Sequence, residues 1–90
     1  MTRVKDFDIR FEKCLRGLAL DNPRIRVYPA DYAEYKYFGS IVSPSFEGMN
    51  EAKRQSLVWG QILESLDDDD QRRVEFVYTD APSEQMSVST

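Results

Sequence analysis

The sequence predicts a two-layer α+β domain in the order helix, strand, strand, helix, strand. Two stretches repeat apolar residues at the helical period, and three short segments alternate polar with apolar residues as half-buried strands do. The longer helical stretch lies between the second and third of these segments. We therefore expect a three-stranded sheet covered on one face by the helices, because each layer then buries its apolar side against the other.

Length and composition bound the class of protein. We expect one domain over residues 7–82, with a loose lead-in at 1–6 and a flexible tail at 83–90. With 41% hydrophobic and 31% charged residues, the chain has the composition of a soluble globular protein. No apolar run approaches the roughly 20 residues of a membrane span, and the N-terminus lacks a signal-peptide stretch. We expect a cytoplasmic monomer that does not bind membranes.

The first helix is predicted to begin near Phe7. Phe7, Ile9 and Phe11 alternate as in a strand, but Phe11 and Leu15 continue a helical face that extends over about three turns. We therefore favour a helix. It should end before Pro23, because proline disfavours helical geometry in the residue that precedes it.

The predicted strands cover Arg24–Tyr28, about Tyr35–Ser43, and Val74–Thr79. Ile25 and Val27 share one face of the first strand, as in a strand that is half-buried. In the third strand, the side chains expected on one face are those of Val74, Phe76 and Tyr78.

Four tyrosines surround the turn between the first two strands: Tyr28, Tyr32, Tyr35 and Tyr37. Such a cluster fits the stacking of nucleic-acid bases. It also fits cross-strand packing with the hydroxyl groups in water, which is the interpretation that we favour.

The second helix is predicted from Glu51 to Leu66. Asn50 is suited to cap it, and Glu51 places a negative charge near the positive end of the helix dipole. One helical stripe is expected to lie on the sheet, widened by Ile62 and formed by Ala52, Ser56, Trp59, Leu63 and Leu66.

Four consecutive aspartates, Asp67 to Asp70, follow the second helix. Calcium-binding loops alternate their ligands and contain a glycine at which the chain turns, and this run has neither feature. We expect a solvated loop, in which Arg72 and Arg73 offset part of the negative charge.

The segment IVSPSFEGMNEAKRQSLVWGQILESL resembles the signature of the BolA-like proteins, in which a strand and Val-Ser are followed by Phe-Glu-Gly and a helix. The match is carried by Val42, Ser43, Phe46, Glu47, Gly48, Arg54, Leu57, Val58 and Leu63, with a weaker similarity at Thr79, Pro82 and Glu84. It covers about residues 9–84 and implies a fold like that of class II KH domains.

The resemblance implies a partner and a cofactor. BolA-like proteins associate with monothiol glutaredoxins and share a [2Fe-2S] cluster through a His before the third strand and a Cys or His in the first hairpin. Here the first position is Arg73, or Arg72 if the register moves by one, and the second lies near Ala33. The family's Arg-His-Arg of the long helix reads Arg54-Gln55-Ser56. Arginine stays protonated and cannot donate a lone pair to iron, so we expect no cofactor.

The residue inventory predicts that the protein is not an enzyme. The sequence contains no histidine, which excludes an imidazole base and every His-containing metal site. The single cysteine, Cys14, is expected to be a small core residue and not a reactive thiol. The GxxG motif of nucleic-acid-binding KH domains is also absent, since the comparable turn reads Phe-Glu-Gly-Met.

Our first hypothesis is a non-catalytic interaction protein that docks on a glutaredoxin or another iron-sulfur handling partner. The predicted surface consists of Phe46, Glu47, Gly48, Arg54, Gln55, Arg72 and Arg73, although Phe46 fits the core better, as large aromatic residues usually do. Leu57 points away from the predicted stripe, so we expect it either on such a surface or under the first helix.

The alternative is a KH-like nucleic-acid-binding module. Phosphates would meet Lys53, Arg54, Arg72 and Arg73, helped by Arg24 and Arg26 if that strand face is open. The net charge of −4 argues against it. A third hypothesis is a degenerate scaffold within a larger assembly.

Overall fold

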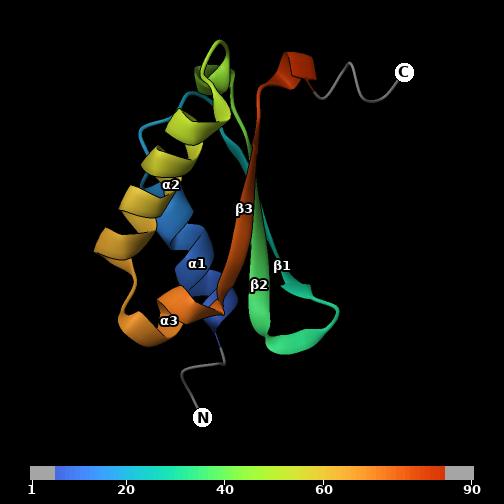
Figure 1. The fold of residues 1–90 in the computed structure, drawn as a ribbon, viewed down its shortest axis with the longest axis vertical. Helices are drawn as coiled ribbons and strands as arrows, with labels where there is room; N and C mark the ends of the chain where they lie inside the picture. Colours follow the sequence, from blue (N-terminus) through green and yellow to red (C-terminus); the bar gives the residue numbers. More distant parts are fainter. Residues whose placement is uncertain (1–5, 85–90) are drawn as a thin grey trace.

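The computed structural model describes residues 6–84, and in it the predicted order of elements is confirmed (Figure 1). The elements are α1 (Phe7–Arg16), β1 (Arg24–Ala30), β2 (Ala33–Val42), η1 (Pro44–Phe46), α2 (Glu51–Ser65), α3 (Asp68–Arg73) and β3 (Val74–Asp80). Two short helices, η1 and α3, occupy positions where the sequence predicted a turn and a loop. Neither α1 nor α2 is long and apolar enough to cross a bilayer, and the same holds for every other helix of residues 6–84.

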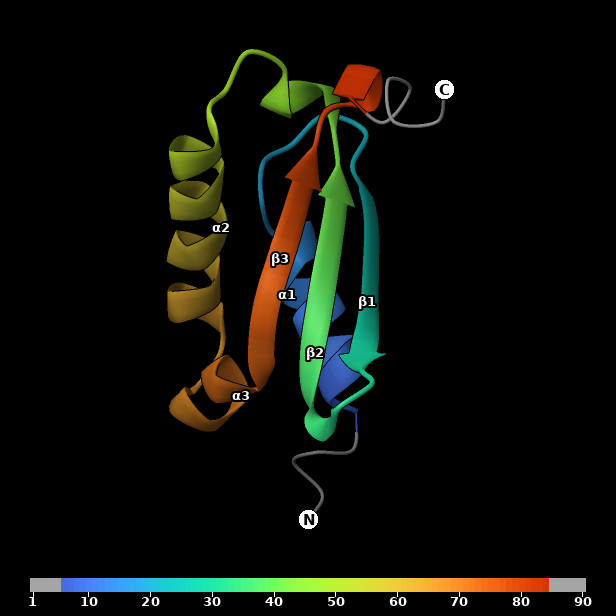
Figure 2. The same cartoon turned by 45° about the vertical axis from the view of Figure 1, so that its right-hand side comes forward.

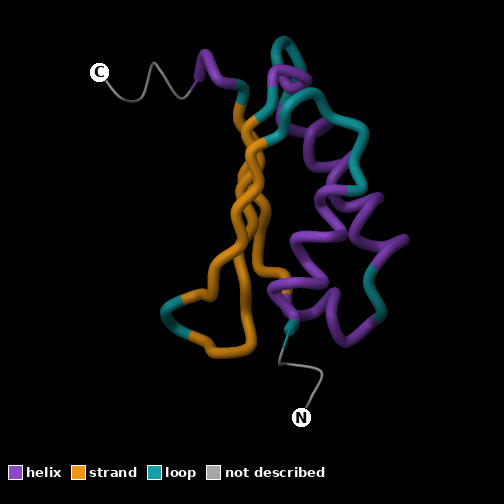
Figure 3. The backbone as a smooth tube through the Cα atoms, turned by 180° about the vertical axis from the view of Figure 1, so that it is seen from behind, coloured by secondary structure: helices purple, strands orange, loops and turns teal. Residues whose placement is uncertain are grey.

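The three strands form one mixed sheet with β2 in the centre (Figure 2). β1 pairs with β2 antiparallel, and β2 pairs with β3 parallel. Helices α1, α2 and α3 lie together on one side of this sheet, and none of the three covers its other face (Figures 1 and 3). The predicted α+β fold class, two layers with helices on one face, is therefore confirmed.

The core lies between α1, α2 and the sheet. Phe7, Phe11 and Leu15 of α1 are fully buried. α1 approaches the centre of β2 at Gly39, where an added Cβ atom would lie 3.1 Å from the side chains of both Phe11 and Leu15. Glycine at this position therefore lets the helix and the sheet come into close contact.

The expected buried stripe of α2 is correct only in part: Ile62 and Leu66 are buried, but Ala52 and Ser56 are exposed. The buried residues of this helix are Arg54, Val58 and Ile62, whereas the side chain of Leu63 is 62% exposed. Val58 and Ile62 repeat at a spacing of four and bury more apolar area than the alanine and serine of the predicted stripe. A buried arginine lies on the same face, and sequence patterns treat arginine as exposed.

The aspartate run was predicted to be a solvated loop, but Asp68–Asp70 instead begin the helix α3. Asp67, Asp68 and Asp69 are exposed as predicted, and Arg72 and Arg73 do lie 3.6 and 3.7 Å from Asp69 and Asp70. Asp67 caps α3, because its carboxylate accepts a hydrogen bond of 2.9 Å from the backbone N–H of Asp70. Carboxylates in the first turn of a helix interact favourably with its dipole. Asp70 is 2% exposed, and both of its oxygens accept hydrogen bonds from Arg10 on α1, at 2.7 and 2.9 Å. The run thus ties α3 to α1.

The predicted face of β3 is correct only in part. Val74 is buried, but Phe76 and Tyr78 lie on the open face of the sheet. Tyr37 pairs with Val74 and Phe38 pairs with Phe76, so β3 contains one extra residue between these pairs. Such an irregularity reverses the side to which the following side chains point.

Candidate partner-binding site

The residues predicted to form one surface lie at opposite ends of the molecule. β2 and β3 run parallel, so the end of β2, near the Phe46–Gly48 turn, adjoins the end of β3. Arg72 and Arg73 precede the start of β3, at the other end of the sheet (Figure 2). The 15 residues of α2 connect these ends, a length of about 22 Å. No single partner-binding patch contains both groups.

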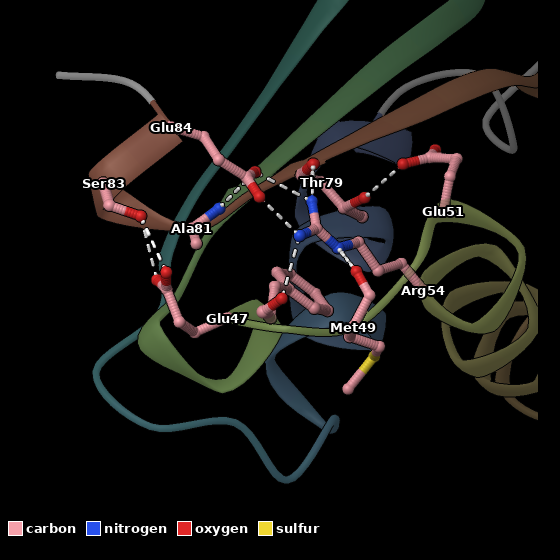
Figure 4. A network of polar contacts seen from close by, with 9 residues as sticks. Glu47, Met49, Glu51, Arg54, Thr79, Ala81, Ser83 and Glu84 are labelled. Atoms are coloured by element: carbon pink, nitrogen blue, oxygen red, sulfur yellow. Dashed lines mark hydrogen bonds and ion pairs between the residues drawn. The ribbon is translucent and has the colours of Figure 1, made fainter. Parts of the chain in front are cut away.

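At the first end, Arg54 occupies the centre of a polar network (Figure 4). Arg54 as a whole is 6% exposed. Nε donates to the backbone oxygen of Met49 at 2.8 Å, and the two terminal nitrogens donate to the backbone oxygens of Phe46 and Thr79 at 2.8 and 3.0 Å. Both terminal nitrogens also donate to the carboxylate of Glu84, at 2.9 and 2.7 Å. We call this group of five residues the Arg54 clasp.

Every N–H of the Arg54 guanidinium has an acceptor, since the group has five donors and makes five hydrogen bonds. The fork geometry of the guanidinium suits the bidentate contact with Glu84. The bond to Arg54 lowers the pKa of Glu84 to about 2, assisted by a hydrogen bond from the backbone N–H of Ala81. Arg54 therefore fastens the chain after β3 to the turn before α2.

The clasp removes several predicted residues from the accessible surface. Phe46 is fully buried, as expected for a large aromatic residue. The guanidinium of Arg54 lies 5.5 Å from the centre of its ring. Gln55 donates to the backbone oxygen of Val77 on β3 at 2.9 Å. Of the predicted residues at this end, only Glu47 and Gly48 are exposed, and Gly48 has a φ of +75°.

The predicted tail also begins inside this network. Ser83 donates to the carboxylate of Glu47 at 3.0 and 2.9 Å, and Glu84 belongs to the clasp. The ordered domain therefore includes residues 83 and 84. The rest of the predicted tail, 85–90, and residues 1–5 of the lead-in lie outside the described residues.

At the other end, the tip of the first hairpin meets the start of β3. Lys36 donates to the backbone oxygen of Arg72 at 2.7 Å, lies 3.9 Å from the carboxylate of Glu75, and is 5.7 Å from the ring centre of Tyr35. The pKa of Tyr32 is raised, first by partial desolvation and then by its hydrogen bond to Glu75. We call these residues the hairpin-end surface: Tyr32, Tyr35, Lys36, Arg72 and Glu75.

Three members of the hairpin-end surface are widely accessible. Tyr32 and Tyr35 are 65% and 54% exposed, and the side chain of Arg72 is 78% exposed. Arg73 differs from its neighbour: its side chain is 15% exposed, and its Nε lies 3.7 Å from the buried carboxylate of Asp70. Arg73 therefore belongs to the interior.

The resemblance assigned cluster ligands to positions that lie at this same end. Ala33 is the first residue of β2, and Arg73 is the last residue of α3, directly before β3. Neither side chain can donate a lone pair to iron. Cys14 cannot replace them here, because it is 5% exposed on α1, beside Gln61 of α2. Burial raises the pKa of its thiol, which opposes formation of the thiolate that binds metals.

Two other features concern metal and small-molecule binding. Within residues 6–84, no three carboxylate or cysteine side chains are grouped so that they could hold a metal ion. A hollow of about 500 Å³ lies beside Cys14 between α1, α2 and α3, and Arg10 and Asp70 line it. Arg10 and Asp70 already bind each other, so the charges of this pair are satisfied within the protein.

Sequence reasoning missed most of the hairpin-end surface. Tyr32 and Tyr35 were noticed only as part of a tyrosine cluster, and Lys36 and Glu75 carried no signal of their own. The cluster in fact separates: Tyr37 packs against Phe7 in the core, with ring centres 5.1 Å apart. The alternation of side chains along a strand would have assigned Tyr37 to the buried face only if the residues at the tip of the hairpin had been known.

Solved structures with the same fold exist. BolA1 from Arabidopsis thaliana is similar over 89% of this chain and 96% of its own, with a TM-score of 0.64 and 26% sequence identity. A Bol-like protein from Babesia bovis is similar over 92% of this chain and 93% of its own, with a TM-score of 0.58 and 19% identity. No family model matches the chain, and no curated protein does.

Proposed function

We propose that this chain, which has a BolA-like fold, is a non-catalytic interaction protein that docks on a monothiol glutaredoxin or another iron-sulfur handling partner without donating a ligand to the cluster. The fold and its resemblance to the BolA-like proteins supply the class of partner. The residues of this chain supply the rest: no histidine is present, and the single cysteine is buried.

The observation that carries the proposal is the hairpin-end surface. It occupies the end of the sheet to which the resemblance assigns the shared cluster, and it exposes two tyrosines and an arginine. Tyrosine and arginine are the residue types that contribute most to binding at protein interfaces, because they combine large contact area with hydrogen-bonding groups. The partner would then supply all cluster ligands, and this chain would contribute contact area.

The phosphate-binding set of the alternative hypothesis does not form one cationic surface. Arg54 is enclosed in its clasp, and Arg73 faces Asp70. Lys53 lies in the first turn of α2, whereas Arg72 lies in α3, beyond the other end of α2. Arg24 and Arg26, which were expected to help them, lie on β1. We therefore base the proposed function on the protein partner.

The test is calorimetric titration with a monothiol glutaredoxin that carries its [2Fe-2S] cluster. We expect binding with no new visible absorption band, because the ligands of the cluster do not change. Tyr32→Ala and Arg72→Ala should each weaken binding by about tenfold, equivalent to about 1.4 kcal/mol.

The matched control is Lys53→Ala, which removes an exposed cation at the other end of α2 and should leave the affinity unchanged. Absence of heat together with absence of NMR shifts would refute docking on this partner. A new absorption band on mixing would show that the chain does ligate the cluster. Equal weakening by Lys53→Ala would place the contact elsewhere.

A further inference from the structure

The open face of the sheet carries a row of aromatic side chains that crosses all three strands. Tyr28 of β1 stacks on Phe38 of β2, with ring centres 5.8 Å apart and planes at 23°. Phe38 stacks in turn on Tyr78 of β3, at 5.9 Å and 25°. Phe76 packs edge-on against Tyr78 at 5.0 Å. We call these four residues the aromatic row.

The alternation of β2 shows that the row faces away from the helices. On either side of Phe38, Tyr37 packs against Phe7 of α1, and an added Cβ at Gly39 would contact α1. Because neighbouring residues of a strand point to opposite faces, Phe38 lies on the uncovered face. Figure 3 shows α1, α2 and α3 on the other side of the sheet.

The two tyrosines of the row remain accessible. Tyr28 is 37% exposed and Tyr78 is 46% exposed, while Phe38 between them is only half-buried. Aromatic pairs across strands stabilise a sheet, and this accounts for the contacts within the row. Sheet stability alone does not require the rings of Tyr28 and Tyr78 to be exposed. With Phe38 between them, these exposed rings form a continuous apolar patch, which is typical of a binding surface.

Two arginines lie beside the row on β1. Arg24 and Arg26 are exposed and share the face of Tyr28, since they precede it by four and two residues. Within residues 6–84, neither forms a hydrogen bond or an ion pair with another side chain. Residues two apart on a strand are separated by about 7 Å, which is comparable to the spacing of successive phosphates in an extended single strand.

The charge of this face differs from that of the whole chain. The protein has a net charge of −4, and four of its 16 acidic residues lie in the Asp67–Asp70 run at the start of α3, on the helical side of the sheet. On the open face, Glu75 is paired with Lys36, and Asp80 lies on β3, on the opposite side of β2 from the arginines. The β1 side of the face is therefore locally cationic.

We propose that the open sheet face binds single-stranded nucleic acid, with bases stacked on Tyr28 and Tyr78 and phosphates against Arg24 and Arg26. Every base has a π face, so stacking on aromatic side chains is strong and tolerant of sequence. Open sheets with aromatic residues bind single-stranded RNA in this manner in other folds. An acidic peptide would use the arginines but would leave the ring faces without a purpose. The site adjoins the hairpin-end surface, to which Lys36 and Glu75 belong.

The binding test uses fluorescein-labelled 12-residue oligomers of dT and of rU, followed by fluorescence anisotropy at low salt and then at rising salt. Two phosphate contacts predict a slope of log K against log [salt] of about −1.4. The tyrosine emission of the protein should be quenched on binding. Comparison of the two oligomers distinguishes DNA from RNA as the better ligand.

Variants locate the site. Tyr28→Leu and Tyr78→Leu keep apolar bulk but remove the stacking surface, and each should weaken binding by at least about fivefold. Arg24→Glu and Arg26→Glu should weaken it further and flatten the salt dependence. Lys53→Glu is the matched control, because it reverses a cation on α2, on the opposite side of the sheet, and should bind as the native protein does. Thermal unfolding checks that each variant is folded.

Three outcomes would overturn the proposal. One is no anisotropy change with either oligomer at low salt. Another is an equal loss of affinity in the Lys53→Glu control. The third is that NMR signals of Tyr28, Phe38 and Tyr78 shift with a glutaredoxin but not with an oligomer, which would assign this face to a protein partner.

Discussion

Arg54 and Arg72 were predicted for the same surface, yet they occupy opposite situations. The side chain of Arg54 is 8% exposed, and the five N–H groups of its guanidinium donate to backbone oxygens and a carboxylate. The side chain of Arg72 is 78% exposed, and its only ion pair within residues 6–84 is a contact of 3.6 Å with Asp69. One arginine holds the fold together, and the other is available to a partner.

The difference shows what an arginine needs in order to be buried. The cost of removing a guanidinium from water is offset only when all of its donors find acceptors. The turn before α2 and the end of β3 provide them around Arg54. The end of α3 provides one distant carboxylate for Arg72. We therefore expect substitutions in and around the clasp to destabilise the protein more than substitution of Arg72.

Arg54→Ala should lower the free energy of unfolding by about 3–5 kcal/mol, the cost of breaking a buried ion pair. The change leaves the backbone oxygens of Phe46 and Thr79 without their donor and removes the partner of Glu84. Denaturation by urea measures the loss, with Arg72→Ala as the matched control. A loss below about 1 kcal/mol would contradict the structural role that we assign to the clasp.

The clasp should also make stability depend on pH. Glu84 has a pKa of about 2 in the folded protein, lowered from 4.5 by Arg54. Because the folded-state pKa is depressed, this contribution is fully present above pH 4.5 and is lost as the pH falls towards 2. We expect Glu84→Gln to be less stable than the native protein at neutral pH, and the difference to shrink below pH 4.5. Thermal midpoints recorded across this range check the prediction, and a constant difference would disprove it.

Gly48→Ala should destabilise the protein by about 1 kcal/mol. Gly48 has a φ of +75°, which alanine adopts only with strain, although nothing lies within 4 Å of its added Cβ. Gly60→Ala is the matched control, since Gly60 lies inside α2 with equal space around it. That control should instead stabilise the protein, by about 0.5–1 kcal/mol, because alanine favours a helix more than glycine does. Effects of the same sign would contradict the argument.

Arg72→Ala should change the free energy of unfolding by less than about 0.5 kcal/mol, as substitutions of exposed residues usually do. The same variant should weaken docking on a glutaredoxin, as proposed above. Urea denaturation and calorimetric titration of one preparation measure both quantities. A large loss of stability would show that Arg72 resembles Arg54 after all.

Local patterns predicted most of the elements. Asn50 caps α2 as expected, because its side-chain oxygen accepts a hydrogen bond of 2.9 Å from the backbone N–H of Lys53. Cys14 is a buried core residue, also as expected. The face of α2 was predicted only in part, because a buried arginine lies on it and the apolar period alone could not reveal that. The function of Asp70 was missed because its partner, Arg10, is 60 residues away.

The sequence by itself determined the order of the two longer helices and the three strands, the cap of α2 at Asn50, and the absence of histidine. These depend on each residue and its near neighbours along the chain. Only the tertiary structure decided which cations are buried, which end of the sheet each occupies, and that an aromatic row lies on the open face. The reason is physical: the acceptors that enclose Arg54 include Thr79 and Glu84, 25 and 30 residues away, and they come together only when the sheet forms.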